Sequence, residues 1–395
     1  MSKFTTNKLE EIADVQTGPF GSQLHMSDYK KEGTPIITVE HLDENRIIHK
    51  NLPLVGDEDK NRLKKYTLKE GDIVFSRVGS VDRCAYVSAK EDDWMFSGRL
   101  LRVRTNEKVD SRFLSFYFNQ ESFKEYIRRI AVGATMPSIN TTILSEVEII
   151  LPPLKEQKTI AETLSSLDEK IDLLHRQKKN LQALAEILFR QWFVEEAEES
   201  WELGTIGDVV SMKGGTTPST NQPKYWDGNI HWTSPRDLSN STSIFLFATS
   251  RKITEEGLKQ ISSGLLPVGT LLLSSRAPIG YLALTEIPVA INQGYIAIIC
   301  DKLVSNHFMF LWCKANMGTI ENAANGSVFQ EISKSAFRTL PFLIPPNEKV
   351  NKFELEIEPI FQKIKSNTQQ IHTLTRLRNT ILPKLISGEA TIKDI

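Results

Sequence analysis

The sequence is poor in cysteine, has no excess charge of either sign and contains no long apolar run. Its three cysteines, Cys84, Cys300 and Cys313, are odd in number and lack metal-ligand spacing, which argues against a disulfide scaffold and suits a reducing compartment. Lysine and arginine number 48 against 49 acidic residues, so overall charge gives no attraction to nucleic acid or membranes. No stretch approaches the ~20 apolar residues of a membrane helix, and the N-terminus lacks the apolar core of a signal peptide. We therefore expect a cytoplasmic protein that makes no contact with a membrane.

What the sequence does contain is an internal repeat with a period of about 195 residues. The segment EGDIVFSR at 70–77 has an echo in VGTLLLSSR at 268–276, and LPP at 151–153 corresponds to IPP at 344–346. Because the matching segments keep their order, the pattern indicates a tandem duplication. The period is much longer than that of short solenoid repeats.

The first part of each repeat is rich in short apolar runs, such as 36–39, 72–75 and 271–273, separated by Gly, Pro, Asn and Asp. This pattern of short apolar runs is typical of a strand-rich α/β domain, here with a few helices such as 111–130. The glycines near the start of each domain, at positions 18, 21, 214 and 215, are expected to form turns.

The last part of each repeat is a long amphipathic segment that follows the Pro-Pro pair. Apolar residues recur there at alternating spacings of four and three, the 3.5-residue period of a coiled-coil seam. The two long helices are predicted to pair with each other, although each could instead pack only on its own domain. The residues expected to pair the helices are Ile171, Leu174, Lys178, Leu181, Leu188, Ile364, Asn367, Ile371, Leu374 and Ile381.

The ends of these helices can also be predicted. Ser166 and Glu169 have the spacing of a capping box, and Pro359 stands where a helix often begins. We therefore expect a short helix after each Pro-Pro pair, a break, and a long helix from about residue 166 or 359. Ser387-Gly388 should end the second one.

Motifs that carry chemistry are missing from the sequence. It has no phosphate-binding Gly-x-x-x-x-Gly-Lys-Ser/Thr loop, no dinucleotide fingerprint, and no histidine pair with zinc-ligand spacing. The Pro-Pro pairs lack the Asn and the aromatic residue with which amino-methyltransferases hold a flipped base. The sequence therefore predicts no catalytic residue and no metal site.

Several motifs, in order and in both repeats, make the chain resemble the specificity subunit of a type I restriction-modification system. They are TGPFGS at 17–22, GDIVFSR at 71–77, LPPLKEQK at 151–158, KGGTTPS at 213–219, YWDGNI at 225–230, WTSPRDL at 232–238, SSRAPIG at 274–280 and NQGY at 292–295.

The resemblance implies an α+β fold. It would be a tandem duplication of a strand-rich α/β target-recognition domain plus a long helix, the two helices pairing as an antiparallel coiled coil with pseudo-twofold symmetry. The implied division is target-recognition domain 1 at 1–153, a central helical spacer at 154–197, target-recognition domain 2 at 198–346 and a distal helical spacer at 347–395.

The resemblance also implies a function and partners. The two domains would read the halves of a bipartite, asymmetric site in double-stranded DNA, while two modification (methyltransferase) subunits and the restriction/translocase subunits dock on this chain. S-adenosylmethionine, ATP and Mg²⁺ would then be held by those partners, and this chain would be non-catalytic and without a cofactor.

Candidate DNA-binding residues follow from side-chain chemistry. Arginine pairs bidentately with guanine, and lysine or threonine suits phosphate. For each arginine the alternative is an ion pair within the fold. For Arg77 and Arg276, which lie in repeated motifs, a shared structural or phosphate-directed role is favoured. The candidates are Arg77, Arg83, Arg99, Lys64 and Lys65 in the first domain, and Lys213, Thr216, Thr217, Lys224, Arg236, Arg251 and Arg276 in the second.

Charge balance complicates this interpretation. Residues 1–153 carry 22 Lys+Arg against 23 Asp+Glu, and residues 198–346 carry 11 against 12, whereas a free-standing DNA-binding domain is usually basic. We expect the isolated chain to bind DNA weakly and with strong salt dependence. Two other functions stay open: a helical adaptor that assembles protein partners without reading DNA, and an enzyme whose site is assembled without a motif.

Overall fold

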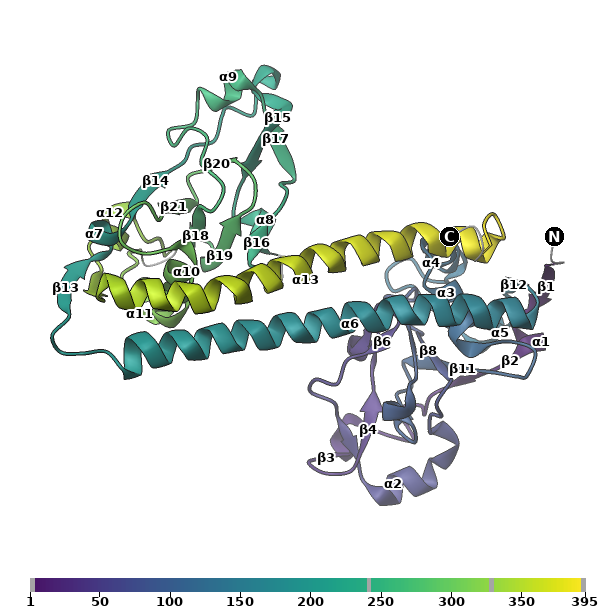
Figure 1. The fold of residues 1–395 in the computed structure, drawn as a ribbon. Helices are drawn as coiled ribbons and strands as arrows, with labels where there is room; N and C mark the ends of the chain where they lie inside the picture. The colour runs from purple at the N-terminus through teal and green to yellow at the C-terminus, as the bar shows by residue number, and fades with distance from the viewer. Residues whose placement is uncertain (1–3, 240–242, 327–329, 392–395) are drawn as a thin grey trace. The chain divides into compact units, whose positions relative to one another are not determined.

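The computed structural model describes residues 4–239, 243–326 and 330–391 (Figure 1). The chain divides into two compact units, Met1–Ile171 with Thr373–Ile395 (unit 1) and Asp172–His372 (unit 2). Each unit consists of one globular domain and a segment from each of two long helices, α6 (Leu154–Arg190) and α13 (Asn347–Ser387). Within the described ranges, no helix has both the length and the apolar character that a membrane crossing requires.

The globular domain of unit 1 is built on an antiparallel sheet. This sheet has the order β2-β11-β8-β9, with strands at Ala13–Thr17, Leu100–Thr105, Ile73–Ser76 and Cys84–Tyr86. Strand β8 is buried along its whole length, which agrees with its apolar run Ile73-Val74-Phe75. A second sheet, β10-β4-β7-β3, spans Met95–Phe96, Thr34–Ile37, Leu54–Val55 and Tyr29–Lys30.

Smaller elements complete unit 1. Strands β1 (Thr5–Lys8) and β12 (Glu148–Leu151) pair antiparallel at the entry and exit of the domain, and β5 (Leu42–Asp43) pairs with β6 (Arg46–Ile47). The helices of the domain are α1 (Leu9–Ile12), α2 (Asp57–Arg62), α3 (Ser111–Phe118), α4 (Glu121–Ile130) and α5 (Thr141–Ser145).

Unit 2 repeats this plan. Its larger sheet, β14-β21-β18-β19-β16, spans Ser211–Gly214, Tyr295–Ile299, Leu271–Ser275, Ile279–Thr285 and Phe245–Leu246. Its smaller sheet, β17-β15-β20, spans Arg251–Ile253, Trp226–Thr233 and Val289–Ile291. Strands β13 (Glu202–Thr205) and β22 (Pro341–Ile344) pair antiparallel at the ends of the domain. The helices are α7 (Ile206–Val209), α8 (Arg236–Ser239), α9 (Glu255–Leu258), α10 (Asn306–Ala315), α11 (Met317–Asn322) and α12 (Lys334–Arg338).

Shared strand pairings confirm the predicted duplication. In both units a parallel pair, β4 with β10 or β15 with β20, accompanies the larger sheet. A Cβ atom on Gly18 would lie 2.2 Å from the carbonyl oxygen of Ser97, and one on Gly215 would lie 2.0 Å from that of Ile291. Both glycines are therefore required by a close backbone approach, and a turn is not the reason for them. A Cβ on Gly21 or Gly214 would meet nothing within 4 Å.

The predicted break in the long helices is wrong, because α6 and α13 run without interruption through residues 166 and 359. The Ser166 hydroxyl donates to the carbonyl of Thr163, one turn back, so it does not cap a new helix. Pro359 lacks the N–H that would bond to the carbonyl of Leu355, and Leu355 lies on the solvent side, where water can bind that carbonyl. The predicted C-terminus is confirmed: α13 ends at Ser387, and Gly388 has a φ of +74°.

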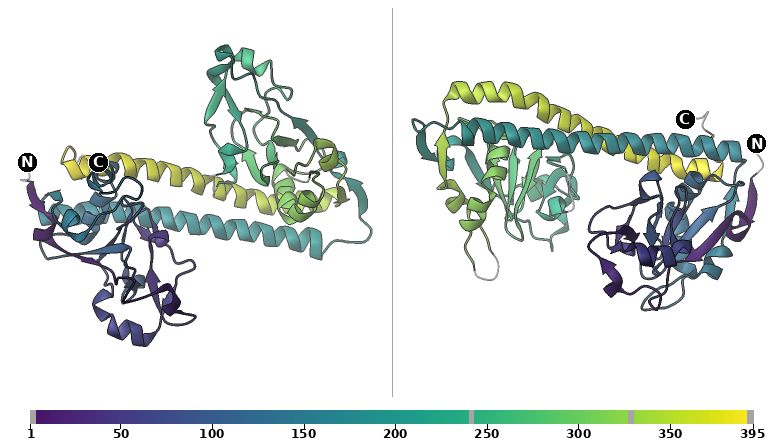
Figure 2. Two further views of the ribbon diagram at one scale, coloured as in Figure 1. Left: turned by 180° about the vertical axis from the view of Figure 1, so that it is seen from behind. Right: turned by 90° about the horizontal axis from the view of Figure 1, so that it is seen from below.

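Within unit 2, the segments of α6 and α13 lie side by side and antiparallel (Figures 1 and 2). The Asn367 amide donates to Gln177 Oε1 over 3.3 Å, and the ring centroids of Phe189 and Phe353 lie 6.1 Å apart. As the residue number increases from 177 to 189 along α6, the number of the facing residue in α13 decreases from 367 to 353. One apolar core joins these segments to α10 and the larger sheet.

Within unit 1, the other segments of the two helices share a core with the first domain. Ile160 and Leu164 of α6 pack in the same cluster as Ile381 and Leu385 of α13 and Phe113 of α3. An Asp168–Arg378 ion pair of 2.7 Å joins the two helices at the edge of this core.

The predicted pairing residues lie on the inner faces of the helices. Leu181, Leu188 and Leu374 are partly buried, and the other seven are buried. Near the end of α6, however, Phe189 is buried, one position after the predicted Leu188, and Phe193 in the turn that follows α6 is buried as well. A helix of 3.6 residues per turn drifts from a strict 3.5-residue repeat, and the last turn, Gln191–Glu195, is a wider π turn.

Phe189→Ala tests this shift of the buried face. Phe189 is 2% exposed and contacts the rings of Phe193, Phe308 and Phe353. Its truncation should lower the free energy of unfolding of unit 2 by about 3–5 kcal/mol. The control Leu184→Ala, at an exposed position of the same helix, should cost less than about 1 kcal/mol. Equal losses in chemical denaturation would place the core on the wrong face of α6.

The buried Lys178 should make the stability of unit 2 depend on pH. Burial lowers the pKa of Lys178 from 10.5, so the unfolded chain holds this proton more tightly than the folded chain does. The free energy of unfolding should therefore rise as the pH increases from the lowered pKa toward 10.5. Below that pH range, the folded chain bears the whole cost of burying a charged lysine. Lys178→Met should raise the Tm at pH 7 and flatten the rise at alkaline pH. The control Lys179→Met, at the exposed neighbour, should leave the Tm-against-pH curve unchanged.

Candidate nucleic-acid interface

The strongest candidate site in unit 2 is an arginine stacked on two tryptophans of the smaller sheet. The Arg251 guanidinium carbon on β17 lies 3.5 Å from the ring centroid of Trp226 and 5.5 Å from that of Trp232, both on β15. The two indoles meet edge to face, with centroids 5.1 Å apart. Both tryptophans are buried and Arg251 is exposed, so a rigid aromatic pair supports a solvent-facing cation.

Hydrogen bonds lock this aromatic pair in place. The indole N–H of Trp226 donates to the carbonyl of Ser219 over 3.1 Å, and that of Trp232 donates to the carbonyl of Thr216 over 3.5 Å. A β-bulge in β15 lets both Trp226 and Ile230 oppose Ile253. Because the Arg251 side chain makes no hydrogen bond or ion pair in the described part of the chain, its donor fork is available to a ligand.

The neighbouring loop candidates already bond within the domain. Thr216 Oγ1 donates to the carbonyl of Gln260 and accepts from the amide of Ser262, and Thr217 Oγ1 donates to Gln293 Oε1. Lys213 Nζ is exposed and donates to the carbonyl of Ser263 over 3.3 Å. These residues shape the loop under the tryptophans, and only Lys213 among them carries a charge toward solvent.

The remaining candidates of unit 2 are dispersed. Lys224 pairs with Glu256 over 3.7 Å and lies above the Tyr225 ring, and Arg276 pairs with Glu331 over 3.7 Å. Arg236, at the start of α8, is exposed and has no side-chain partner among the described residues.

In unit 1, the side chains of two candidate arginines form hydrogen bonds within their own domain. Arg77 donates to Thr17 Oγ1 over 3.2 Å and to the carbonyl of Gly98 over 3.4 Å, and its guanidinium lies 5.6 Å from the Phe20 ring. Arg83 is half-buried and donates to the carbonyl of Leu42. These contacts agree with the structural alternative for Arg77, as does the Arg276–Glu331 pair in unit 2.

The free cations of unit 1 lie elsewhere. Arg99 and Lys64 are exposed, and neither side chain has a partner in the ranges that the structure describes. Lys65 is exposed and lies 4.8 Å above the ring of Tyr66. Unit 1 therefore offers exposed cations, but none of its predicted residues stacks on two buried tryptophans as Arg251 does.

Sequence reasoning named Arg251 but missed the two tryptophans beneath it and the histidine beside them. Burial lowers the pKa of His231, and Lys252 lowers it further, and its Nδ1 lies 2.9 Å from Thr249 Oγ1. Both tryptophans stand in motifs of the predicted family, YWDGNI and WTSPRDL, but only the strand register shows that they face the same arginine.

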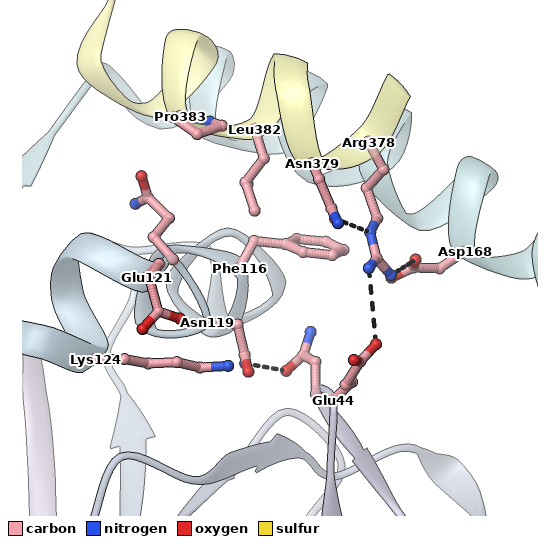
Figure 3. Close-up of a pocket in the computed structure, with 12 residues that line it drawn as sticks. Glu44, Phe116, Asn119, Glu121, Lys124, Asp168, Arg378, Asn379, Leu382 and Pro383 are labelled. Atoms are coloured by element: carbon pink, nitrogen blue, oxygen red, sulfur yellow. Dashed lines mark hydrogen bonds and ion pairs between the residues drawn. The ribbon is translucent and has the colours of Figure 1, made fainter. Parts of the chain in front are cut away.

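Unit 1 contains a cavity of about 330 Å³ between the first domain and α13 (Figure 3). Arg378 projects from α13 toward Asp168 and Glu44, at 2.7 and 3.8 Å, and Asn119 donates to Asn45 over 3.1 Å. Phe116 and Leu382 form an apolar wall. Arg378 is already paired with Asp168 and Glu44, and Leu382 of α13 lines the cavity together with Phe116 of α3, so the cavity lies where α13 packs on the domain.

Comparison with protein families gives two matches. The family described as "Type I restriction modification DNA specificity domain" matches residues 1–183 and again residues 198–381. The two matched ranges cover most of the chain and follow the internal repeat.

Individual relatives agree. The type I restriction enzyme MjaIX specificity subunit of Methanocaldococcus jannaschii is 32% identical over 191 residues, 48% of this chain and 44% of that protein. The HindI specificity subunit of Haemophilus influenzae is 22% identical and covers 87% of this chain and 92% of its own length. The crystal structure of a type I restriction-modification S subunit from M. genitalium has a similar fold, with a TM-score of 0.66 at 16% identity over 97% of this chain and 96% of that one.

Proposed function

Because the chain belongs to the type I restriction-modification specificity family, we propose that its two globular domains read the two parts of a bipartite DNA sequence. As a specificity subunit, the chain is a non-catalytic component of such a system. The domains share a frame but differ in the residues they expose, so the two half-sites should differ and the full site should be asymmetric.

The stacked arginine of unit 2 is the observation that carries this proposal. Arg251 presents a rigid donor fork to solvent, and such a fork matches the O6 and N7 acceptors of guanine in the major groove. The tryptophans hold the guanidinium plane before DNA arrives, so little side-chain freedom is lost on binding.

The long helices would separate the two domains. With 37 and 41 residues, α6 and α13 are about 55–60 Å long at 1.5 Å per residue. Half-sites one turn of DNA apart have centres ~34 Å from each other, a distance within this length. The paired helices would then set the unread gap between half-sites.

Partners complete the proposed activity. Two modification subunits and the restriction subunits would dock on this chain in the cytoplasm and hold S-adenosylmethionine, ATP and Mg²⁺. Because neither domain is basic overall, those subunits would also supply most phosphate contacts, and the isolated chain would bind DNA weakly.

Methylation mapping tests the function. Long-read sequencing of the source genome, with this gene intact and deleted, should show a two-part asymmetric motif methylated only in the intact strain. Replacing residues 1–153 by the corresponding domain of a relative should change one half of the motif and leave the other. Identical maps in a strain that expresses the chain and its methylase would favour the protein adaptor.

To decide whether Arg251 reads a base or contacts phosphate, the test needs a variant that keeps the positive charge. In the complete methyltransferase, Arg251→Ala should reduce methylation of the cognate site about 10- to 100-fold, since one bidentate pair discriminates by about 1–3 kcal/mol. Arg251→Lys retains a cation for phosphate but loses the fork, so it should be impaired nearly as much. If Arg251→Lys keeps full sequence preference, Arg251 contacts phosphate and the half-site is read elsewhere. The control Lys259→Ala, at an exposed lysine of the same domain, should have no effect.

A further inference from the structure

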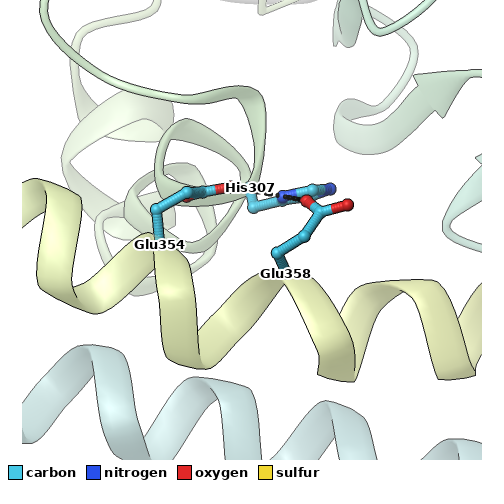
Figure 4. A group of neighbouring side chains, drawn as sticks. All are labelled: His307, Glu354 and Glu358. Carbon is cyan, nitrogen blue, oxygen red and sulfur yellow. Dashed lines mark hydrogen bonds and ion pairs between the residues drawn. The ribbon is translucent and has the colours of Figure 1, made fainter.

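Three side chains of unit 2 converge where α10 packs on α13 (Figure 4). His307 comes from α10, and Glu354 and Glu358 stand one turn apart on α13, so their carboxylates project from the same face. His307 Nδ1 lies 2.9 Å from Glu354 Oε1 and 3.1 Å from Glu358 Oε2. The three ligand atoms all lie within 4.8 Å of one another.

Outer hydrogen bonds orient both carboxylates toward the histidine. Ser305 Oγ donates to Glu354 Oε2, and Gln362 Nε2 donates to Glu358 Oε1 over 2.6 Å. Each glutamate therefore has one oxygen fixed from outside and turns the other to His307 Nδ1. The imidazole plane is fixed as well, because it lies against the Phe361 ring with centroids 4.3 Å apart. Such outer contacts are what orients the ligands of metal sites.

The charges at this point are not balanced by the protein. Nδ1 of a histidine carries at most one hydrogen, so it cannot fully serve two carboxylate oxygens. Within the described ranges, neither Glu354 nor Glu358 has a lysine or arginine within ion-pair distance. A doubly charged cation would neutralise both carboxylates and bind the lone pair of the imidazole at once.

We propose that His307 Nδ1, Glu354 Oε1 and Glu358 Oε2 bind one zinc ion, with water as the fourth ligand. Zinc takes imidazole nitrogen and carboxylate oxygen at about 2.0–2.2 Å in tetrahedral geometry, which places ligand atoms about 3.3 Å apart. The distances from His307 Nδ1 to the two carboxylate oxygens, 2.9 and 3.1 Å, are close to this value. An imidazole ligand favours zinc over magnesium or calcium. The side chain of His307 is 10% exposed and that of Glu358 is 44% exposed, so water reaches the site from the Glu358 side.

The proposed ion would tie the second globular domain to a long helix. His307 belongs to the domain and both glutamates belong to α13, so zinc would add a cross-link to the apolar core beside them. The sequence predicted no metal site, because His307 is far from Glu354 along the chain and the local spacing of zinc ligands is absent.

Calorimetric titration of the full chain tests this site. After treatment with EDTA, the protein should bind one equivalent of Zn²⁺ from ZnCl₂ at the site, and its Tm should rise on binding. Glu354→Gln and Glu358→Gln each preserve shape and outer hydrogen bonding but remove a charge, and each should weaken this binding by about 100-fold. The matched control Glu356→Gln, an exposed glutamate between them, should bind as the wild type does.

X-ray absorption at the zinc edge supplies the second readout. The bound ion should show nitrogen and oxygen neighbours and no sulfur. The proposal is overturned if the chain takes up no zinc, if both glutamine variants bind like the wild type, or if sulfur appears among the ligands. Far-ultraviolet circular dichroism of the metal-free variants checks that they fold, so a loss of zinc cannot be assigned to unfolding.

Discussion

The packing of the long helices into the core of each domain is the constraint on which the rest depends. In unit 2, α6 with the π turn that follows it, and α13, contribute Phe189, Phe193, Phe353 and Phe361 to the same core as the larger sheet and α10. In unit 1, the other segments of both helices pack with α3 and the first domain. The helices are therefore part of each folding core. A change in their apolar seam would disturb the domains as well as the pairing.

Much of this arrangement could be predicted because it repeats in the sequence. The duplication follows from segments that recur in the same order. The long helices and their buried seam follow from the 3.5-residue spacing of apolar residues, which reflects local helix geometry. The break at Ser166 was predicted wrongly, because a capping box is a local pattern that packing can override: the seam continues through Leu164 and Leu167, and their burial favours an unbroken helix. The shift from Leu188 to Phe189 was missed because a strict 3.5-residue repeat was assumed, whereas a helix of 3.6 residues per turn drifts from that repeat.

The candidate site was predicted less well, for a different reason. Charge and motif identified Arg251, yet what distinguishes it from Arg77 or Arg276 is the surface beneath it. Trp226 and Trp232 support Arg251, whereas Arg77 bonds to Thr17 and Gly98. Such differences arise from strand register. The residues that the two repeats share thus serve the common frame, and the residues that differ are better placed to discriminate between ligands.

The strands that open and close each domain are paired with each other. Thr5 lies opposite Leu151 in one unit, and Glu202 lies opposite Ile344 in the other. The start and the end of each domain therefore lie side by side, and a long helix begins immediately after the closing strand. A recombination event with in-frame breakpoints in these strands would exchange a whole domain and leave the long helices and their seam unchanged. Each domain can therefore be inherited as a single block of sequence.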